Sequence, residues 1–307
     1  MAGAGSDERA GLLYGTSAYL IWGAFPLYFP LLEPAGTIEI LAQRMAWSLI
    51  VVLLVLRFGG GGFGGVRAVL RDRAKVGVLA LAGVFIAVNW GTYIYAVNSG
   101  HVVEASLGYF INPLFTILLG VVVLGERLRR AQWVAVGIGT LAVLVIAVDY
   151  GRPPWIALVL AFSFGMYGFC KKRADVGAVD SLAVETAVQF VPALVAIAII
   201  GAQGSLVFGT RASTSVLLAG SGLITVIPLL LFAAGTRRLP LSVVGLLQFL
   251  TPVLQFAVGV GIRHEPLPTA ELAGFCLVWL ALIVLSVDGL RAQRRGRARP
   301  VPEAVAA

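Results

Sequence analysis

Charged side chains are scarce in this chain. Asp, Glu, Lys and Arg make up 12% of its 307 residues, whereas hydrophobic residues make up 59% and the mean hydropathy is +0.94. A soluble globular domain has about 25% charged residues. The composition therefore excludes an ordinary soluble protein, and we expect most of the chain to lie in a lipid bilayer.

Cysteine and histidine are nearly absent. The two cysteines, Cys170 and Cys276, lie in apolar segments, and the only histidines are His101 and His264. Their positions have no spacing typical of a disulfide or a metal site. The sequence thus predicts no disulfide, metal, cofactor or catalytic residue. The net charge of +8 does not indicate nucleic-acid binding, because the basic residues fall between apolar segments.

Ten apolar segments are long enough for membrane-spanning helices, each of which needs about 20 residues. Gly- and Pro-containing stretches, such as 59–65 and Pro153-Pro154, separate them. The segments are 12–31, 37–57, 75–98, 103–124, 131–148, 153–171, 181–201, 215–234, 241–262 and 269–288. The predicted fold is an all-α polytopic membrane protein with ten transmembrane helices.

The basic residues lie mainly on one side of the predicted spans. Nineteen of the 23 Lys and Arg residues fall on that side, while Arg152, Arg211 and Arg263 fall on the other and Arg44 lies inside a span. Cytoplasmic loops are enriched in Lys and Arg. We therefore expect a multi-pass cell-membrane protein with both termini in the cytoplasm, and a first span that is not cleaved as a signal peptide.

A long stretch of the chain is repeated. Residues 95–149 match 234–288 without a gap, so that Phe110-Ile-Asn-Pro113 aligns with Phe249-Leu-Thr-Pro252. Each half holds five spans, an odd number, and the halves are therefore predicted to be inverted. The predicted parts are a first repeat at 1–148, a second at 149–288 and a basic cytoplasmic tail at 289–307. Inverted repeats are typical of secondary transporters, which bind substrate between the halves.

Arg44 is the most costly residue to place in the membrane. It lies about seven residues into its span, roughly 10 Å deep at 1.5 Å per residue. Insertion of Arg near a helix centre costs ~2.5–3.5 kcal/mol. One interpretation is a structural arginine that pairs with Glu39 or Glu104 or extends its charged end outward to the membrane interface. The other is a charge that meets the substrate or a coupling ion.

Two mirrored prolines suggest a site at the membrane midplane. Pro113 and Pro252 lack an N–H, so the carbonyls of Tyr109 and Gln248 lose their helical partners. Freed carbonyls at membrane depth are tolerated in protein interiors or beside wet cavities. The sequence therefore predicts that Asn112 and Thr251 face one cavity, although the prolines could also serve packing alone.

Further polar residues extend this hypothesis. Glu104, Gly108 and Asn112 share one helix face, as do Gln248, Thr251 and Gln255. The predicted substrate-binding residues are Arg44, Asn89, Tyr93, Glu104, Tyr109, Asn112, Gln248 and Thr251, and the predicted proton-coupling residues are Glu104 and Glu185. The competing interpretation is interhelical hydrogen bonding, worth ~0.6 kcal/mol on average in lipid.

Aromatic and loop residues have competing interpretations as well. Trp22, Trp47, Trp90 and Tyr167 could stack on an aromatic substrate or belong to interface belts. Lys171 and Lys172 are expected to anchor the inner interface. Glu126 and Glu265 are expected to cap helices or to pair with Arg129 or Arg263, and the alternative is that they are transport carboxylates.

Several strings resemble one transporter family. They include Tyr19-Leu-Ile-Trp-Gly-Ala-Phe-Pro-Leu-Tyr28, Glu104-Ala-Ser-Leu-Gly-Tyr-Phe-Ile-Asn-Pro113 and Leu124-Gly-Glu-Arg127. The chain resembles the RarD group in the EamA branch of the drug/metabolite transporter superfamily over nearly its whole length. The resemblance implies ten helices in two inverted repeats and a bacterial inner-membrane permease. Members usually carry His where this chain has Gln43, which makes a proton-carrying role unavailable there.

The favoured function is a secondary transporter, working outward, of a small metabolite or drug, with proton coupling through Glu104 or Glu185. The expected partners are that substrate and the bilayer, and a homodimer is left open. No nucleotide-binding G-x-x-x-x-G-K-[ST] motif is present. A polytopic enzyme would need a catalytic constellation, and a channel would need repeated pore residues. These two functions, or a scaffold, are the alternatives.

Overall fold

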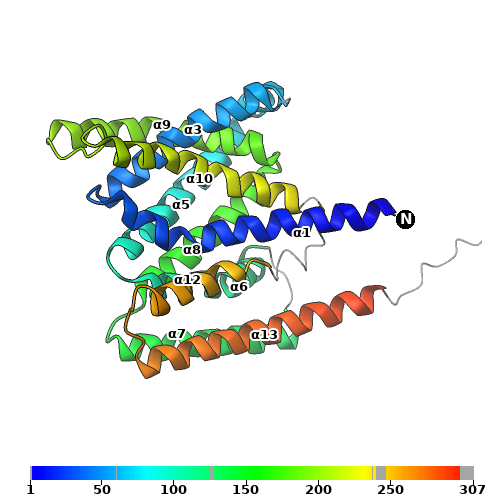
Figure 1. Ribbon diagram of the computed structural model, residues 1–307. Helices are drawn as coiled ribbons and strands as arrows, with labels where there is room; N and C mark the ends of the chain where they lie inside the picture. Colours follow the sequence, from blue (N-terminus) through cyan, green and yellow to red (C-terminus); the bar gives the residue numbers. More distant parts are fainter. Residues whose placement is uncertain (1, 60, 125–127, 237, 240–246, 298–307) are drawn as a thin grey trace, which may run out of the picture. The chain divides into compact units, whose positions relative to one another are not determined.

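The computed structural model describes residues 2–59, 61–124, 128–236, 238–239 and 247–297, and no strand occurs among them (Figure 1). The chain forms two compact units. Unit 1 holds Met1–Phe115 and Pro154–Leu267, and unit 2 holds Thr116–Pro153 and Pro268–Ala307. The helices are α1 (Ala2–Gly23), α2 (Phe25–Tyr28), the 3-10 helix η1 (Phe29–Leu32), α3 (Thr37–Phe58), α4 (Gly64–Arg71), α5 (Arg73–Asn98), α6 (Val102–Leu124), α7 (Arg130–Asp149), α8 (Trp155–Ala174), α9 (Ala178–Ala202), α10 (Ala212–Thr236), α12 (Leu250–Gly261) and α13 (Thr269–Arg297).

The long helices follow the predicted apolar segments closely. Seven described helices are long and apolar enough to cross a membrane, and the apolar helices Trp155–Lys171 and Leu250–Gly261 are shorter. The protein is therefore a multi-pass membrane protein, whereas the count of ten spans and the inverted repeat stay predictions. The segment predicted at 241–262 begins in residues that lie outside the described part of the chain.

The first predicted span is not one helix. Residues 12–31 are divided among α1, α2 and η1, with a turn at Ala24. Pro26 and Pro30 explain the division, because neither can donate the backbone hydrogen bond that an uninterrupted helix requires. In particular, Pro26 is four residues after Trp22, so the Trp22 carbonyl has no helical donor.

Helix α4 was not predicted, because the sequence suggested only a glycine-rich linker followed by a basic loop. Its buried residue is Val69, while Arg67 and Arg71 are exposed. The next helix, α5, begins after Asp72, whose carboxylate accepts the backbone N–H groups of Ala74 and Lys75 at 3.0 and 3.1 Å. This is ordinary N-capping chemistry.

Unit 1 is a bundle in which α3 contacts α9 and α10, α5 contacts α8 and α9, and α1 contacts α10 and α12 (Figure 1). Glycines allow the closest approaches. A Cβ on Gly108 would lie 2.8 Å from the Ala157 carbonyl oxygen, and one on Gly222 would lie 2.6 Å from the Trp47 carbonyl carbon. Small residues at helix crossings let backbones pack closely in membrane bundles. Gly108 thus allows α6 to pack closely against α8, and Gly222 allows α10 to pack closely against α3.

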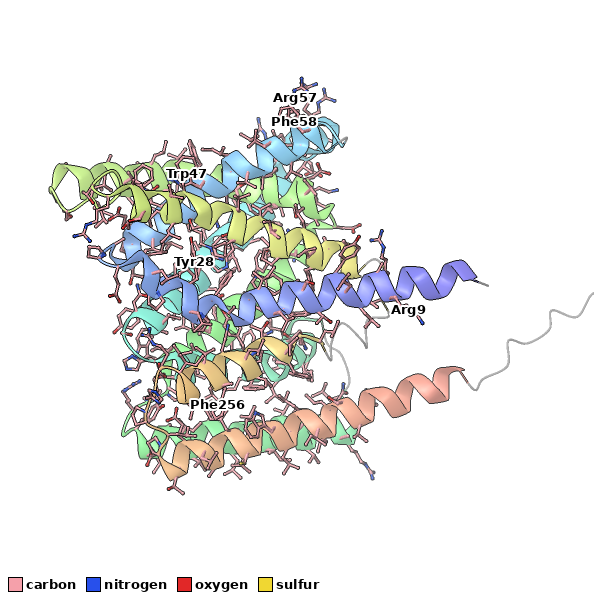
Figure 2. The ribbon with its side chains drawn as sticks, in the orientation of Figure 1. Arg9, Tyr28, Trp47, Arg57, Phe58 and Phe256 are labelled. Atoms are coloured by element: carbon pink, nitrogen blue, oxygen red, sulfur yellow. The ribbon has the colours of Figure 1, made fainter. Side chains whose placement is uncertain are left out.

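The surface of the helices is apolar, as expected for lipid contact. Leu13, Val148 and Val216 are among many large apolar side chains that are exposed. Figure 2 shows Arg57 and Phe58 together at the end of α3, where the guanidinium carbon lies 5.4 Å from the ring centroid. An arginine beside an exposed aromatic ring at a helix end is typical of a membrane interface.

Unit 2 contains α7 and α13, which pack against each other. Polar contacts join them near both ends. Arg129 and Asp288 form an ion pair at 2.6 Å, and the Tyr150 hydroxyl donates to a Glu271 carboxylate oxygen at 2.7 Å. These contacts hold together the fifth and tenth predicted spans.

A candidate binding cavity

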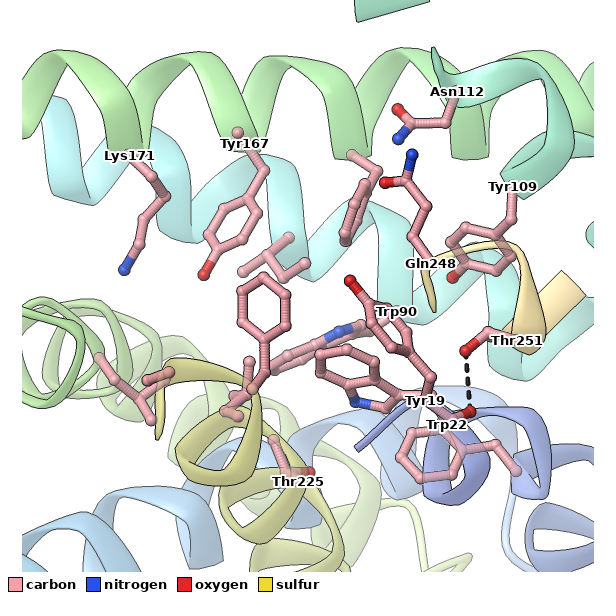
Figure 3. Close-up of a pocket in the computed structure, with 18 of the residues that line it drawn as sticks. Tyr19, Trp22, Trp90, Tyr109, Asn112, Tyr167, Lys171, Thr225, Gln248 and Thr251 are labelled. Carbon is pink, nitrogen blue, oxygen red and sulfur yellow. Dashed lines mark hydrogen bonds between the residues drawn. The ribbon is translucent and has the colours of Figure 1, made fainter. Parts of the chain in front are cut away.

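Unit 1 encloses a cavity of about 590 Å³, which Figure 3 shows in close-up. Cavities that bind small molecules measure about 300–1,000 Å³ and are mostly apolar with a few placed polar groups. This wall fits that description. Tyr19, Trp22 and Phe232 contribute aromatic surface, while Asn112 and Gln248 contribute amides.

Arg44 on α3 enters the cavity wall as a buried charge. Its side chain is 3% exposed, its Nε donates to the Thr225 hydroxyl at 2.6 Å, and its guanidinium carbon lies 4.2 Å from the centroid of Trp90. Phe25 and Phe29 add rings at 5.1 and 5.7 Å. Stacking on aromatic faces partly replaces water around a guanidinium.

The sequence-based pairing of Arg44 with Glu39 or Glu104 is wrong. In the part of the chain that the structure describes, Arg44 forms no ion pair. Glu39 accepts the backbone N–H groups of Val207 and Phe208, the latter at 2.8 Å. Backbone N–H groups of a loop thus bind the Glu39 carboxylate, which the sequence had suggested as a partner of Arg44.

Two residues of the predicted polar stripe join α12 to α1. The Thr251 hydroxyl donates to the Tyr19 carbonyl at 2.9 Å, and Gln255 Nε2 donates to the Trp22 carbonyl at 3.3 Å (Figure 3 shows the first). The second bond supplies the donor that Pro26 removes from α1. Tyr19 and Trp22 of α1 and the start of α12 are therefore held together beside the cavity.

The two prolines of the predicted mirror sit differently in their helices. Pro113 lies inside α6, so the Tyr109 carbonyl has no helical N–H donor. Pro252 lies in the first turn of α12, whose described part begins at Leu250. A first-turn N–H has no intrahelical acceptor, so proline is tolerated there. The described residues therefore do not show the predicted kink at Pro252 within a continuous span.

Five predicted binding residues line this one cavity: Arg44, Tyr109, Asn112, Gln248 and Thr251. Figure 3 shows the amide groups of Asn112 and Gln248 pointing toward each other, with Tyr109 nearby. The Tyr109 hydroxyl donates to Asn89 Oδ1 at 3.1 Å, which fixes the ring against the wall.

Three predicted binding residues lie outside the lining. Asn89 is buried and its amide donates to the Leu160 carbonyl and to Ser163, at 3.0 and 3.1 Å. Tyr93 is buried, with its ring packed against Tyr109. A Glu104 carboxylate oxygen accepts the Ile156 N–H at 3.2 Å. These residues fasten α5 and α6 to neighbouring elements and so support the wall from behind.

A second charged group stands at one end of the cavity. Lys171 lines it, and its amine binds a Glu185 carboxylate oxygen at 2.6 Å and also Ser181. The Tyr167 hydroxyl donates to the other Glu185 oxygen at 3.2 Å. Figure 3 shows Lys171 and Tyr167 at the opposite end of the view from Asn112. Lys171, expected as an interface anchor, is thus half of an ion pair.

The loop carboxylates behave as expected where they are described. Glu265 accepts the N–H groups of Val102 and Val103, both at 2.8 Å, at the start of α6. This is the predicted capping role. The counterpart Glu126 lies outside the described residues.

Sequence reasoning missed Thr225, Tyr19 and Phe232. Ser221 and Thr225 lie four residues apart on one face of α10, within its apolar stretch from Val216 to Ala234, and that spacing was the available signal. Three of the four aromatic candidates, Trp22, Trp90 and Tyr167, line the cavity. Trp47 does not, and its indole donates to Gln43 at 3.1 Å.

No metal centre is apparent in the described ranges. Among those residues, no three His, Cys, Asp or Glu side chains gather closely enough to hold a metal ion. The cavity wall contains Arg44, which has no carboxylate partner in this part of the chain, and Lys171, which is paired with Glu185. Its other groups are amides, hydroxyls and aromatic rings. Such a wall can bind and orient an amphipathic molecule.

Known proteins resemble the chain over nearly its whole length. The model of the EamA-like transporter family matches residues 9–148 and again 153–287. Protein RarD of Streptomyces exfoliatus is 56% identical, over 96% of this chain and 93% of its own. Protein RarD of Escherichia coli is 38% identical, over 94% and 98%. An uncharacterized transporter of Bacillus subtilis, YojE, is 37% identical, over 95% and 98%.

A solved crystal structure shares the fold. It has a TM-score of 0.59 against this chain at 20% sequence identity, and the match covers 90% of this chain and 97% of the other. At that identity, the likeness concerns the arrangement of the helices alone.

Proposed function

The chain belongs to the EamA-like transporter family, and on that premise we propose that it is a secondary transporter that carries a small organic molecule across the bacterial inner membrane by alternating access. The observation that carries the proposal is the cavity. It lies within the helices of unit 1, measures about 590 Å³, and is bordered by polar residues from α3, α6, α8, α10 and α12. A site walled by many helices can open to either side when those helices shift.

The proposed architecture is ten transmembrane helices in two inverted five-helix repeats. Two observations support it: the gapless similarity of residues 95–149 to 234–288, and the two successive matches of one family model. In inverted-repeat transporters, exchanging the conformations of the two halves moves the opening from one face to the other. The interruption after Gly23 and the beginning of α12 at Leu250 supply helix ends beside the cavity.

We propose outward transport coupled to protons through Glu185. This carboxylate touches the cavity residue Lys171 and accepts a bond from Tyr167, which also lines the cavity. Protonation of Glu185 would remove the attraction that holds Lys171, so the state of one proton would change the cavity wall. Neither carboxylate is in the lining, and Glu104 is the weaker candidate because its carboxylate accepts the N–H of Ile156, which is not a lining residue, whereas Glu185 contacts two lining residues.

Purified protein in proteoliposomes tests the proposal. Vesicles loaded with the small-molecule extract of a bacterial culture would be compared with empty-bilayer vesicles, with and without an imposed pH gradient. We expect at least one compound to leave protein-containing vesicles faster, and the gradient to change that rate. Equal loss from both kinds of vesicle would contradict transport, whereas a rate unaffected by the gradient would contradict only proton coupling.

A further inference from the structure

The cavity wall is positively charged. Its only charged members are Arg44 and Lys171, and none of the lining residues, all of which lie in the described ranges, is Asp or Glu. The two cations differ in their surroundings, because Lys171 has Glu185 as counter-ion and Arg44 has no carboxylate partner. The net charge that a bound molecule meets therefore comes from Arg44.

One terminal nitrogen of the Arg44 guanidinium has no hydrogen-bond partner among the described residues. Trp90 stacks at 4.2 Å from the guanidinium carbon, and Thr225 takes the Nε–H. Nη1 has no hydrogen-bond partner among the described residues, although the side chain is 3% exposed. Guanidinium N–H groups point outward in the plane of the group and match the two oxygens of a carboxylate. An unpaired guanidinium donor on a residue of the cavity wall thus favours an anionic partner.

The rest of the wall fits an apolar or aromatic body. Tyr19, Trp22 and Phe232 form a cluster with ring centroids 5.4 to 5.9 Å apart, and all three line the cavity. Aromatic rings of a ligand pack favourably against such edges. A ligand cation would instead meet the uncompensated charge of Arg44, at a place where burial reduces screening by water.

We propose that the molecule bound in this cavity is an organic monocarboxylate with an aromatic or apolar body, and that Arg44 binds its carboxylate. The assignment deepens the proposed function, on which it rests, by naming the substrate class. Thr225 and Trp90 orient the guanidinium, and Asn112 and Gln248 line the same cavity.

Matched ligand triplets test the assignment. Each triplet joins one ring system to a carboxylate, a neutral amide or an amine: phenylpropionate, phenylpropionamide and phenylpropylamine, with the corresponding indole series. Stabilisation against heat is measured on purified protein in phosphatidylcholine nanodiscs, where no anionic lipid headgroup competes. Ligands are taken to about 10 mM, where even a millimolar dissociation constant gives measurable stabilisation.

We expect the acids to bind about 10-fold to 100-fold more tightly than the amides, since hydrogen bonds to charged groups differ from neutral ones by roughly that factor. The amines should bind least. In Arg44→Gln the acid and amide should bind equally, and in Arg44→Lys a reduced preference for the acid should remain. Arg57→Gln, which alters an exposed arginine outside the cavity, should behave as wild type.

Several results would overturn the assignment: amides or amines that stabilise as well as acids, acids that produce no shift over the whole range, or an acid preference that survives Arg44→Gln. The outcome is separate from that of the transport assay. Acid-selective binding without flux would contradict the proposed transport and leave the carboxylate assignment standing. Flux of neutral compounds with no preference for acids would support transport and contradict the carboxylate assignment.

Discussion

Replacing Thr225 by valine tests how Arg44 is held in the membrane interior. The two side chains have nearly the same shape, so the substitution creates no cavity. It removes the hydroxyl that accepts from Arg44 Nε at 2.6 Å, across 181 positions of the chain. Thr225 is 1% exposed, and water therefore cannot easily replace the lost acceptor.

The expected loss follows from the charge of the donor. Neutral interhelical hydrogen bonds in membranes contribute ~0.6 kcal/mol on average and at most about 1.7. Hydrogen bonds to charged groups contribute about 1.5–3 kcal/mol. Because the guanidinium is charged and both partners are buried, we expect Thr225→Val to lower the free energy of unfolding by about 1.5–3 kcal/mol.

The measurement is equilibrium unfolding in mixed micelles, with a double-mutant cycle. Thr225→Ser keeps the hydroxyl and serves as the matched control, with less than half of the valine effect expected. In an Arg44→Met background the guanidinium is absent, so Thr225→Val should cost less than half of its effect in wild type, and the remainder reflects the lost bond from the hydroxyl to the Ser221 carbonyl. A similar loss in both backgrounds would refute the Arg44–Thr225 interaction and with it the described orientation of the guanidinium.

Two further predictions concern accessibility and topology. Single cysteines at Asn112 and Thr251, in a background whose native cysteines are replaced, should both react with a small water-soluble thiol reagent, because both positions line the cavity. As a control, a cysteine at Ser163, which is buried and outside the lining, should react far more slowly. Thiols that do not react at either cavity position would count against a water-filled cavity. A reporter fused after Arg173 should be cytoplasmic and one inserted in the 201–215 loop external, as the charge bias requires, and the same side for both would contradict the ten-span topology.

Helix positions were predictable because apolar length and breaking residues determine them. The span predicted at 37–57 is α3, and the one at 75–98 is α5 from Arg73 to Asn98. Helix α4 was not predictable from apolar length, because its eight residues have only a short apolar face and follow a glycine-rich stretch. The break in the first span was signalled by Pro26, but the local pattern does not say that Gln255, far away in the chain, supplies the missing donor.

The candidate site was predictable in part. Mirrored prolines and polar stripes indicated Tyr109, Asn112, Gln248 and Thr251, which line one cavity. Sequence cannot tell which polar groups are already satisfied by neighbours, and for that reason Asn89 looked like a binding residue although α8 occupies its amide.

Arg44 shows the same limit for charges. Its carboxylate neighbours along the chain suggested an ion pair, whereas its partners are a threonine on α10 and the rings of Trp90, Phe25 and Phe29. Those partners come together only through the packing of α3 against α5 and α10. A local sequence pattern holds no record of such long-range contacts.

Flux through Arg44 variants tests the central claim most directly, namely that this cavity is where the protein binds what it transports. Proteoliposomes containing wild type, Arg44→Gln or the surface control Arg57→Gln would be loaded with the same culture extract, and the compounds that leave would be identified by mass spectrometry. We predict that wild type and Arg57→Gln release the same compounds at similar rates and that Arg44→Gln, inserted at equal density, releases them at least about 10-fold more slowly, the factor that corresponds to one lost charged contact. Unchanged release by Arg44→Gln would contradict the claim.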